Sequence, residues 1–283
     1  RDPFKKLTTV FQMSEEMFFL HYGKDGCNRH VLIDECRELF GEIYEQIPEL
    51  PFCNIWTAMQ LSSRLPKGAL FHMGVSNTRR CWNMFQLPES VESACNVGCC
   101  GIDGCVSTLV GASLVNPDRL CYVVVGDLTF FYDLNSLGNH HIGTNLRVML
   151  VNNGRGTEFR LGIHHCNVFG DDADKYMAAA GHFGNKSPLL VKHYAEDLGF
   201  HYLSATTKEE FMTALSNFTN PQLSDHSMIL EVFTDSKDES EALYLMSHIQ
   251  SDAKGMVRSK LKDAVRNVAG EKGINAIKKI LKK

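Results

Sequence analysis

Two predicted strands end in residues that could bind a metal ion and a phosphate group. A hydrophobic run over residues 120–125 leads directly into Gly126 and Asp127, and a second run over residues 148–151 leads into Asn152-Asn153. Because neighbouring parallel strands end at the same edge of a sheet, we expect a carboxylate and an amide oxygen to meet there. A few hard oxygen ligands beside a phosphate site are typical of Mg²⁺ shared with a diphosphate.

Each of these motifs also has a simpler interpretation when it is considered alone. A Gly-Asp pair is a common strand-to-helix turn in which Asp caps the helix, and Asn-Asn-Gly is a common turn sequence. The combination favours a binding site, because both motifs follow hydrophobic strands that are expected to be neighbours.

Alternating strands and helices must position these residues. Strands are predicted at residues 69–73, 91–96, 120–125, 148–151, 201–203 and 228–233. Helices are predicted at residues 31–47, 54–65, 77–86, 102–114, 129–139, 189–198, 207–217 and 236–249. This alternation predicts an α/β fold with three layers, in which helices cover both faces of a mostly parallel sheet. Ligands of such sheets bind beyond the carboxyl ends of the strands.

The composition is that of a globular protein with a full core. Of the 283 residues, 44% are hydrophobic and 22% are charged, which excludes a disordered or collagen-like chain. No run of 18 apolar residues indicates a transmembrane helix. Ten cysteines without a recognisable secretion signal favour free thiols in a reducing compartment, and therefore a cytoplasmic location.

The charge is distributed unevenly along the chain. Residues 254–283 carry ten Lys or Arg against two acidic residues, whereas residues 1–253 carry 19 against 31. A net charge of −4 argues against non-specific nucleic-acid binding by the whole chain. The basic tail has apolar residues at helical spacing, interrupted by Gly270 and Gly273. We favour a helical extension packed on the acidic body or on a partner subunit, with contact to an anionic membrane surface as the alternative.

Across residues 52–250, the two strand-end motifs resemble the diphosphate-binding domain of thiamin diphosphate enzymes. Within that superfamily the likeness is to the family of the menaquinone-pathway enzyme 2-succinyl-5-enolpyruvyl-6-hydroxy-3-cyclohexene-1-carboxylate synthase. Three segments carry it, namely GVSNTRR at 74–80, GCCGIDG at 98–104 and GDLTFFYDLN at 126–135. The resemblance implies a thiamin diphosphate- and Mg²⁺-dependent transferase that decarboxylates a 2-oxo acid donor and transfers the remainder to an acceptor.

The resemblance also implies which residues bind the cofactor and the metal. Mg²⁺ would be held by Asp127, by Asn153 and by the backbone carbonyl of Arg155. The predicted cofactor-binding residues are Gly101, Ile102, Gly126, Asp127, Leu128, Thr129, Asn153 and Arg155. Among them, the Gly101 carbonyl would face the pyrimidine amino group.

Catalytic and substrate-binding roles follow from the same likeness. Ile102 would keep the cofactor in its bent reactive shape, and Phe159 would line the pocket near the thiazolium ring. Ser76 and Arg80 match positions that bind the acceptor, and their spacing predicts that they share one helix face.

Two departures from the family pattern leave the identity of the acceptor open. Val97 stands where the family has an Arg that holds a substrate carboxylate, and Thr157-Glu158 replaces a more apolar pair. An unpaired Glu158 would repel a dianionic acceptor. The alternatives are a decarboxylase of another acidic 2-oxo acid and a non-catalytic, flavodoxin-like diphosphate-binding module.

Three segments are predicted along the chain. Residues 1–47 are interpreted as the end of a preceding central domain with a linker helix and a strand at 7–11. Residues 48–250 form the cofactor domain, and residues 251–283 form the tail. In the superfamily the catalytic carboxylate comes from a pyrimidine-binding domain, which we expect in a longer polypeptide or in another subunit. A homo-oligomer, either a dimer or a tetramer, is therefore expected.

Cysteines and histidines outside these motifs have mainly structural interpretations. Cys95, Cys99, Cys100 and Cys105 lack the paired spacing of zinc sites and are predicted to be buried small residues. The alternative is that Cys99 or Cys100 faces the cofactor. The pairs His140-His141 and His164-His165 are predicted to lie in loops. The second pair is the better candidate for proton transfer, since it follows Phe159 in a segment that could cover the site.

Overall fold

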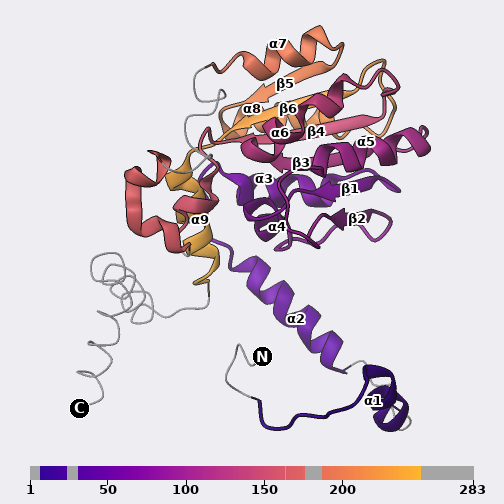
Figure 1. Cartoon of the computed structure of the whole chain (residues 1–283), viewed down its shortest axis with the longest axis vertical. Coiled ribbons are helices and arrows are strands. Elements are labelled where there is room, and N and C mark those ends of the chain that lie inside the picture. The colour runs from indigo at the N-terminus through magenta and orange to yellow at the C-terminus, as the bar shows by residue number, and fades with distance from the viewer. Residues whose placement is uncertain (1–6, 24–30, 163, 176–186, 250–283) are drawn as a thin grey trace. The chain divides into compact units, whose positions relative to one another are not determined.

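The computed structural model describes residues 7–23, 31–162, 164–175 and 187–249 (Figure 1). Contacts divide the chain into two units, residues 1–46 and residues 47–283. The first unit contains helices α1 (Glu15–Tyr22) and α2 (Val31–Glu45). The strand predicted at residues 7–11 is wrong, because these residues are exposed and have no strand to pair with in the described part of this unit. The predicted tail lies outside the described residues.

The second unit is built on a six-stranded sheet in which all neighbouring strands are parallel. Its strands are β1 (Leu70–Met73), β2 (Glu92–Cys95), β3 (Cys121–Gly126), β4 (Leu146–Asn152), β5 (His201–Ala205) and β6 (Met228–Phe233). Their spatial order is β2-β1-β3-β4-β6-β5, so β6 lies between β4 and β5. The order reverses direction between β1 and β3, which is the point where open parallel sheets bind ligands. The predicted α/β fold is confirmed.

Helices cover both faces of this sheet. They are α3 (Asn54–Leu61), α4 (Asn77–Trp82), α5 (Cys105–Val115), α6 (Asp127–Asp133), α7 (Leu190–Asp197), α8 (Lys208–Phe218) and α9 (Ser236–Met246). Alternate residues of β3 point to opposite faces. Val123 and Val125 belong to the hydrophobic cluster that includes α5, α6 and α7, whereas Tyr122 and Val124 belong to the one that includes α3, α4, α8 and α9. The three predicted layers therefore correspond to one sheet with a separate core on each side.

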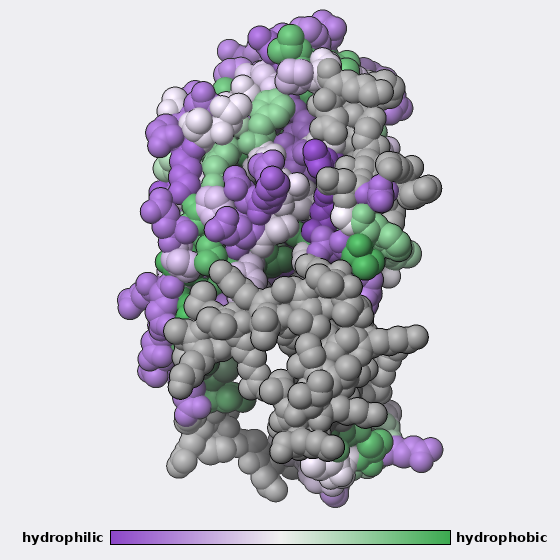
Figure 2. All heavy atoms as spheres, turned by 90° about the vertical axis from the view of Figure 1, so that its left-hand side faces the viewer, coloured by the Kyte–Doolittle hydropathy of each residue, from purple (hydrophilic) through white to green (hydrophobic). Residues whose placement is uncertain are grey.

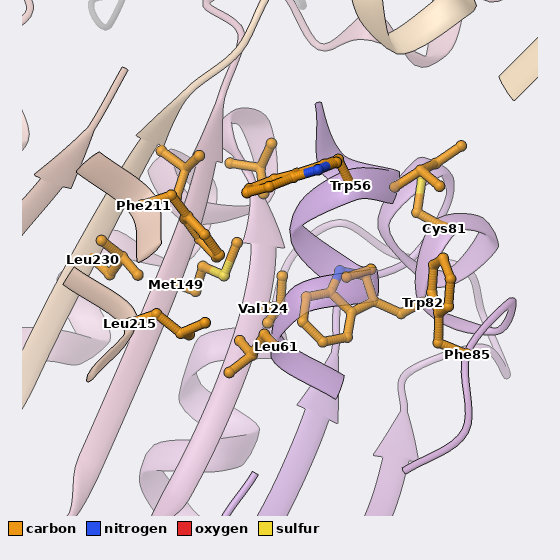
Figure 3. Packing of buried hydrophobic residues seen from close by; sticks show 14 of the residues in the cluster. Trp56, Leu61, Cys81, Trp82, Phe85, Val124, Met149, Phe211, Leu215 and Leu230 are labelled. Atoms are coloured by element: carbon orange, nitrogen blue, oxygen red, sulfur yellow. The ribbon is translucent and has the colours of Figure 1, made fainter. Parts of the chain in front are cut away.

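Several aromatic side chains pack among aliphatic ones in the core on the α3 and α8 side (Figure 3). Trp56 and Phe211 meet edge to face, with ring centroids 5.7 Å apart. The indole N–H of Trp82 donates to Asn54 Oδ1 at 3.1 Å, and the Tyr122 hydroxyl donates to the Phe218 carbonyl at 3.0 Å. These two buried donors thus find a partner, which avoids the cost of leaving a donor unsatisfied.

Several predicted boundaries shift in ways that affect the site. The helix expected over 102–114 begins at Cys105, because Gly104 has a φ of +83° that a helix cannot include. Gly101 and Ile102 therefore lie in the preceding loop. Two short 3₁₀ helices, η1 (Ser62–Arg64) and η2 (Leu134–Gly138), replace the ends of predicted helices. Two others, η3 (Thr157–Arg160) and η4 (His165–Lys175), lie between β4 and α7, where no helix was predicted.

One face of the described structure is mixed in polarity where Figure 2 leaves it uncovered. From the side on which α9 and η4 lie in Figure 1, hydrophilic residues prevail and apolar residues form smaller separate areas (Figure 2). None of the helices in the described ranges has the length and apolar character that are needed to cross a membrane.

Candidate functional site

A pocket of about 340 Å³ lies at the carboxyl ends of β1, β3 and β4. Residues that follow these three strands line most of it, together with the first residue of α3. The lining comprises Asn54, Val75, Ser76, Asn77, Thr78, Cys100, Ile102, Gly126, Asp127, Leu128, Thr129, Val151, Asn153, Gly156, Thr157, Glu158, Phe159 and His164. Eight of the residues predicted from the sequence are in this set, whereas Gly101, Arg80 and Arg155 are not.

Asp127 links the ends of the two central strands. Its side chain is buried, and its Oδ1 accepts a hydrogen bond from the backbone N–H of Leu128 at 2.8 Å. Its Oδ2 accepts from the backbone N–H groups of Arg155 and Gly156, at 3.0 and 3.3 Å. Asp127 is the first residue of α6, and Gly126 occupies the N-cap. The carboxylate therefore does more than cap its own helix, since it also holds the loop that follows β4.

Asn153 converges on the same loop. Its Oδ1 accepts from the N–H of Arg155 at 3.2 Å, so the Asp127 and Asn153 oxygens share one donor and lie close together. Asn152 turns to the opposite side, where its amide donates to Glu231 at 2.7 Å and its Oδ1 accepts from Gly154 N–H at 3.0 Å. Successive side chains of a strand point to opposite sides, so Asn152 has a structural role whereas Asn153 faces the pocket.

The predicted shared helix face of Ser76 and Arg80 is wrong. Ser76 precedes α4 and has a φ of +59° with a ψ of −122°, a region that non-glycine residues rarely adopt. Its strained backbone lies two residues after Gly74, whose N–H donates to the Val124 carbonyl at 2.7 Å. A Cβ at Gly74 would approach that carbonyl oxygen to 3.2 Å. Close contact between β1 and β3 therefore turns the chain sharply, and Ser76 reaches the pocket from this turn.

The Arg80 guanidinium forms a two-pronged ion pair with Glu158. Nη1 lies 3.0 Å from Oε2 and Nη2 lies 3.1 Å from Oε1. The side-chain hydrogen bonds to Glu158 raise the pKa of Arg80 above its ordinary value, against the opposing effect of burial. Glu158 is thus a paired carboxylate, and the condition under which it would repel an anionic acceptor is not met in this state.

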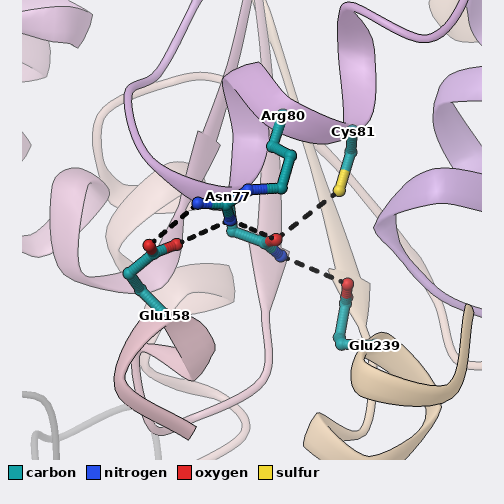
Figure 4. A network of polar contacts seen from close by, with 5 residues as sticks. All are labelled: Asn77, Arg80, Cys81, Glu158 and Glu239. Atoms are coloured by element: carbon teal, nitrogen blue, oxygen red, sulfur yellow. Dashed lines mark hydrogen bonds and ion pairs between the residues drawn. The ribbon is translucent and has the colours of Figure 1, made fainter. Parts of the chain in front are cut away.

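A polar network behind the pocket was not predicted from the sequence (Figure 4). Asn77 accepts from Arg80 Nη1 at 3.3 Å and donates to Glu239 of α9 at 3.4 Å. Glu239 is buried and also accepts from the backbone N–H of Asn54 and from the Thr234 hydroxyl, at 3.0 and 2.8 Å. Burial is the main reason why the pKa of Glu239 rises to about 7. The sequence did contain a signal for Glu239, because it follows the last strand, β6, and ligands of parallel sheets bind beyond the carboxyl ends of the strands.

The loops over the pocket bring together Ile102, Phe159 and His164. The rings of Phe159 and His164 meet edge to face, with centroids 5.3 Å apart. His164 lines the pocket, whereas the exposed pair His140-His141 does not. His164-His165 is therefore better placed for proton transfer than His140-His141, and that role stays a prediction.

The four clustered cysteines differ in exposure. Cys105 is buried as predicted and Cys95 is partly buried, but Cys99 and Cys100 are exposed. The expectation of burial is wrong for these two because they lie in the loop before α5, ahead of the helix that packs on the sheet. The side chain of Cys100 is part of the pocket lining.

Comparison with known proteins identifies the family. Relatives from Bacteroides fragilis and Phocaeicola vulgatus, both named 2-succinyl-5-enolpyruvyl-6-hydroxy-3-cyclohexene-1-carboxylate synthase, are 33% and 34% identical to the chain over 242 and 245 residues. A relative of the same name from Bacteroides thetaiotaomicron is 30% identical over 244 residues. The chain belongs to this synthase family of thiamin diphosphate-dependent enzymes.

The match to the synthase family covers most of the chain but less than half of each relative. The alignments with the B. fragilis and P. vulgatus proteins include 84% of the chain and 41% of the relative. The chain therefore spans about two fifths of the length of the curated synthases that it matches. No protein-family model matches the chain.

Proposed function

We propose that residues 48–250 bind the diphosphate of thiamin diphosphate together with Mg²⁺, as the cofactor domain of a 2-oxo acid decarboxylase and carboligase. The observation that carries the proposal is the convergence of Asp127 and Asn153 on the N–H of Arg155, beside the pocket at the carboxyl ends of β3 and β4. The family resemblance supports thiamin diphosphate as the ligand of this pocket, and the geometry supports Asp127 and Asn153 as oxygen ligands.

The donor set fits magnesium better than a transition metal. The described residues contain no group of three or more His, Cys, Asp or Glu side chains that could hold a metal ion. Asp127, Asn153 and the carbonyl of Arg155 would instead supply one carboxylate, one amide oxygen and one backbone oxygen. Mg²⁺ characteristically uses one or two carboxylates and completes its shell with phosphate oxygens and water.

Other pocket residues have proposed roles in holding and orienting the reactants. Thiamin diphosphate, when bound, supplies the carbon that attacks a 2-oxo acid and takes up the electrons released with CO₂. Gly126, Leu128 and Thr129 would contact the diphosphate, while Ile102 would support the bent cofactor and Phe159 would lie beside its reactive ring. The carbonyl of Gly101, which does not itself line the pocket, would accept a hydrogen bond from the pyrimidine amino group.

The remaining parts of the reaction are assigned to groups beyond this domain. We propose that a pyrimidine-binding domain of the same polypeptide or of another subunit provides the second carboxylate, within a homo-oligomer. The reaction resembles a step of menaquinone biosynthesis, with a 2-oxo acid as donor. A cytoplasmic location is proposed because the described cysteines are free thiols.

Titration with thiamin diphosphate tests this function. We expect binding to depend on Mg²⁺ and to weaken by more than about tenfold in Asp127→Asn, because the variant keeps the shape of the side chain but loses the anionic metal ligand. Calorimetry or the fluorescence of the buried Trp56 and Trp82 would report binding. Asp118→Asn is the matched control, since Asp118 is exposed and lies just before β3, at the opposite end of that strand.

Two results would contradict the proposal. Binding that is independent of Mg²⁺ would favour the flavodoxin-like alternative, a diphosphate-binding module without metal chemistry. Equal binding by the wild-type protein and Asp127→Asn would show that Asp127 does not hold the metal, on which the proposed site depends. The alternative of a different acidic 2-oxo acid leaves both results unchanged. It concerns the substrate, because Val97 and the pocket-lining Glu158 depart from the family pattern.

A further inference from the structure

The wall of the pocket that includes Glu158 carries an ion pair made within the chain. Glu158 uses one oxygen for each terminal nitrogen of Arg80, and Arg80 also donates to Asn77 Oδ1 (Figure 4). The Arg80 and Glu158 side chains are 31% and 24% exposed, so the pair is partly shielded from water. A guanidinium fork matched by both oxygens of a carboxylate has the geometry that arginine uses to recognise carboxylate ligands.

Few other cations are available to an anionic ligand at this wall. No Lys or Arg belongs to the described lining of the pocket, which includes the carboxylates of Asp127 and Glu158. Arg80 is held against this wall by its pair with the lining residue Glu158, so its fork is occupied. An incoming carboxylate would have to displace Glu158, which would then remain beside it as an unpaired negative charge.

We propose that Glu158 determines substrate charge at this site, by occupying Arg80 so that the acceptor carries an uncharged group where it faces Arg80. This inference rests on the proposed function, since it concerns the acceptor end of the same pocket. Glu158 is a specificity-determining residue in this scheme. It disfavours carboxylate ligands both by filling the fork and by repelling a second negative charge.

Chemical modification of Arg80 tests the proposal without requiring cofactor. Phenylglyoxal reacts with accessible arginines, and mass spectrometry of the peptide that contains Arg80 gives the rate at that residue. We expect Glu158→Gln to increase this rate about three- to fivefold, because the charge of the partner is lost while its shape is kept. Succinate, a small dicarboxylate, should protect Arg80 in Glu158→Gln and leave the wild-type rate nearly unchanged.

The control is Glu92→Gln, which removes the single-contact ion pair of Arg119, 2.9 Å long, at the other end of the sheet. It should not alter modification of Arg80. Glu158→Ala is a second variant that removes the ion pair of Arg80. Circular dichroism checks that both Glu158 variants are folded. Equal protection by succinate in the wild-type protein and in Glu158→Gln overturns the proposal, and so does absence of protection in both Glu158 variants. Failure of the proposed function would appear separately, in the titration with thiamin diphosphate.

Discussion

At the scale of single residues, buried carboxylates around the pocket have different surroundings. Asp127 accepts hydrogen bonds from three backbone N–H groups, two of them in the loop that follows β4. Glu239 accepts three hydrogen bonds but lies fully buried, and burial outweighs them, so its pKa rises. Glu239 therefore favours a proton at the back of the site, whereas Asp127 holds the loop that follows β4.

The protonation of Glu239 should make stability depend on pH. Its pKa is about 7 in the folded protein and about 4.5 in the unfolded chain. The stability that this proton contributes is therefore fully present below about pH 4.5 and is lost as the pH rises through 7. Glu239→Gln imitates the protonated form and should escape this loss. Relative to wild type, its free energy of unfolding should increase by up to about 3 kcal/mol between pH 4.5 and pH 8.

Urea denaturation at several pH values measures that difference. Glu241→Gln, an exposed change on the same helix, is the control and should show no such trend. A difference between wild type and Glu239→Gln that stays constant with pH would show that Glu239 keeps its ordinary pKa.

At the scale of secondary-structure elements, the turn between β1 and α4 stores backbone strain at the pocket. Ser76 holds a φ that suits glycine, and its carbonyl accepts from Arg80 N–H at 3.1 Å in the first turn of α4. Strain of this kind persists at sites where the position of a side chain matters. The structure thus links the conformation of Ser76 to the direction of the helix that carries Arg80.

Replacing Ser76 should separate backbone strain from side-chain function. Ser76→Gly should raise the free energy of unfolding by roughly 1 kcal/mol, because glycine adopts this conformation without a Cβ clash. Ser76→Ala removes the hydroxyl but keeps the strain, so it should not gain stability. Denaturant midpoints of both variants check this, and a gain in Ser76→Ala equal to that in Ser76→Gly would refute the explanation by strain.

Element types were predictable from the sequence, whereas the geometry between elements was not. All six strands were found because their hydrophobic runs are bounded by turn residues, and Asp127 and Asn153 followed from strand-end position. The start of α5 was misplaced because helical spacing continues through Gly104, whose positive φ stops the helix. The Arg80–Glu158 pair and the Asn54–Glu239 contact join residues 78 and 185 positions apart, and no local pattern encodes such contacts.

At the scale of the whole molecule, the described part of the second unit has two cores that share one sheet. Met149 and Leu150 are adjacent in β4 and fully buried, yet they belong to different hydrophobic clusters. Because every strand contributes to both clusters or is paired to one that does, loss of packing on either side should weaken the same cooperative unit.

Truncation of either residue tests this coupling. Met149→Ala and Leu150→Ala should each lower the free energy of unfolding by about 2–5 kcal/mol, and each variant should still unfold in a single transition. Circular dichroism and tryptophan fluorescence should report the same midpoint, although Trp56 and Trp82 lie on one face only. Separate midpoints for Leu150→Ala would show that the two layers unfold independently.

The place of β6 between β4 and β5 has a consequence for how the protein is made. All seven residues of β4 are buried in the finished sheet, and one of its two edges is covered by β6, which is synthesised after β5. A growing chain therefore emerges from the ribosome with that hydrophobic edge open until Met228 and the rest of β6 arrive. Open strand edges pair readily with other chains, so the interval before β6 appears is when aggregation competes with folding.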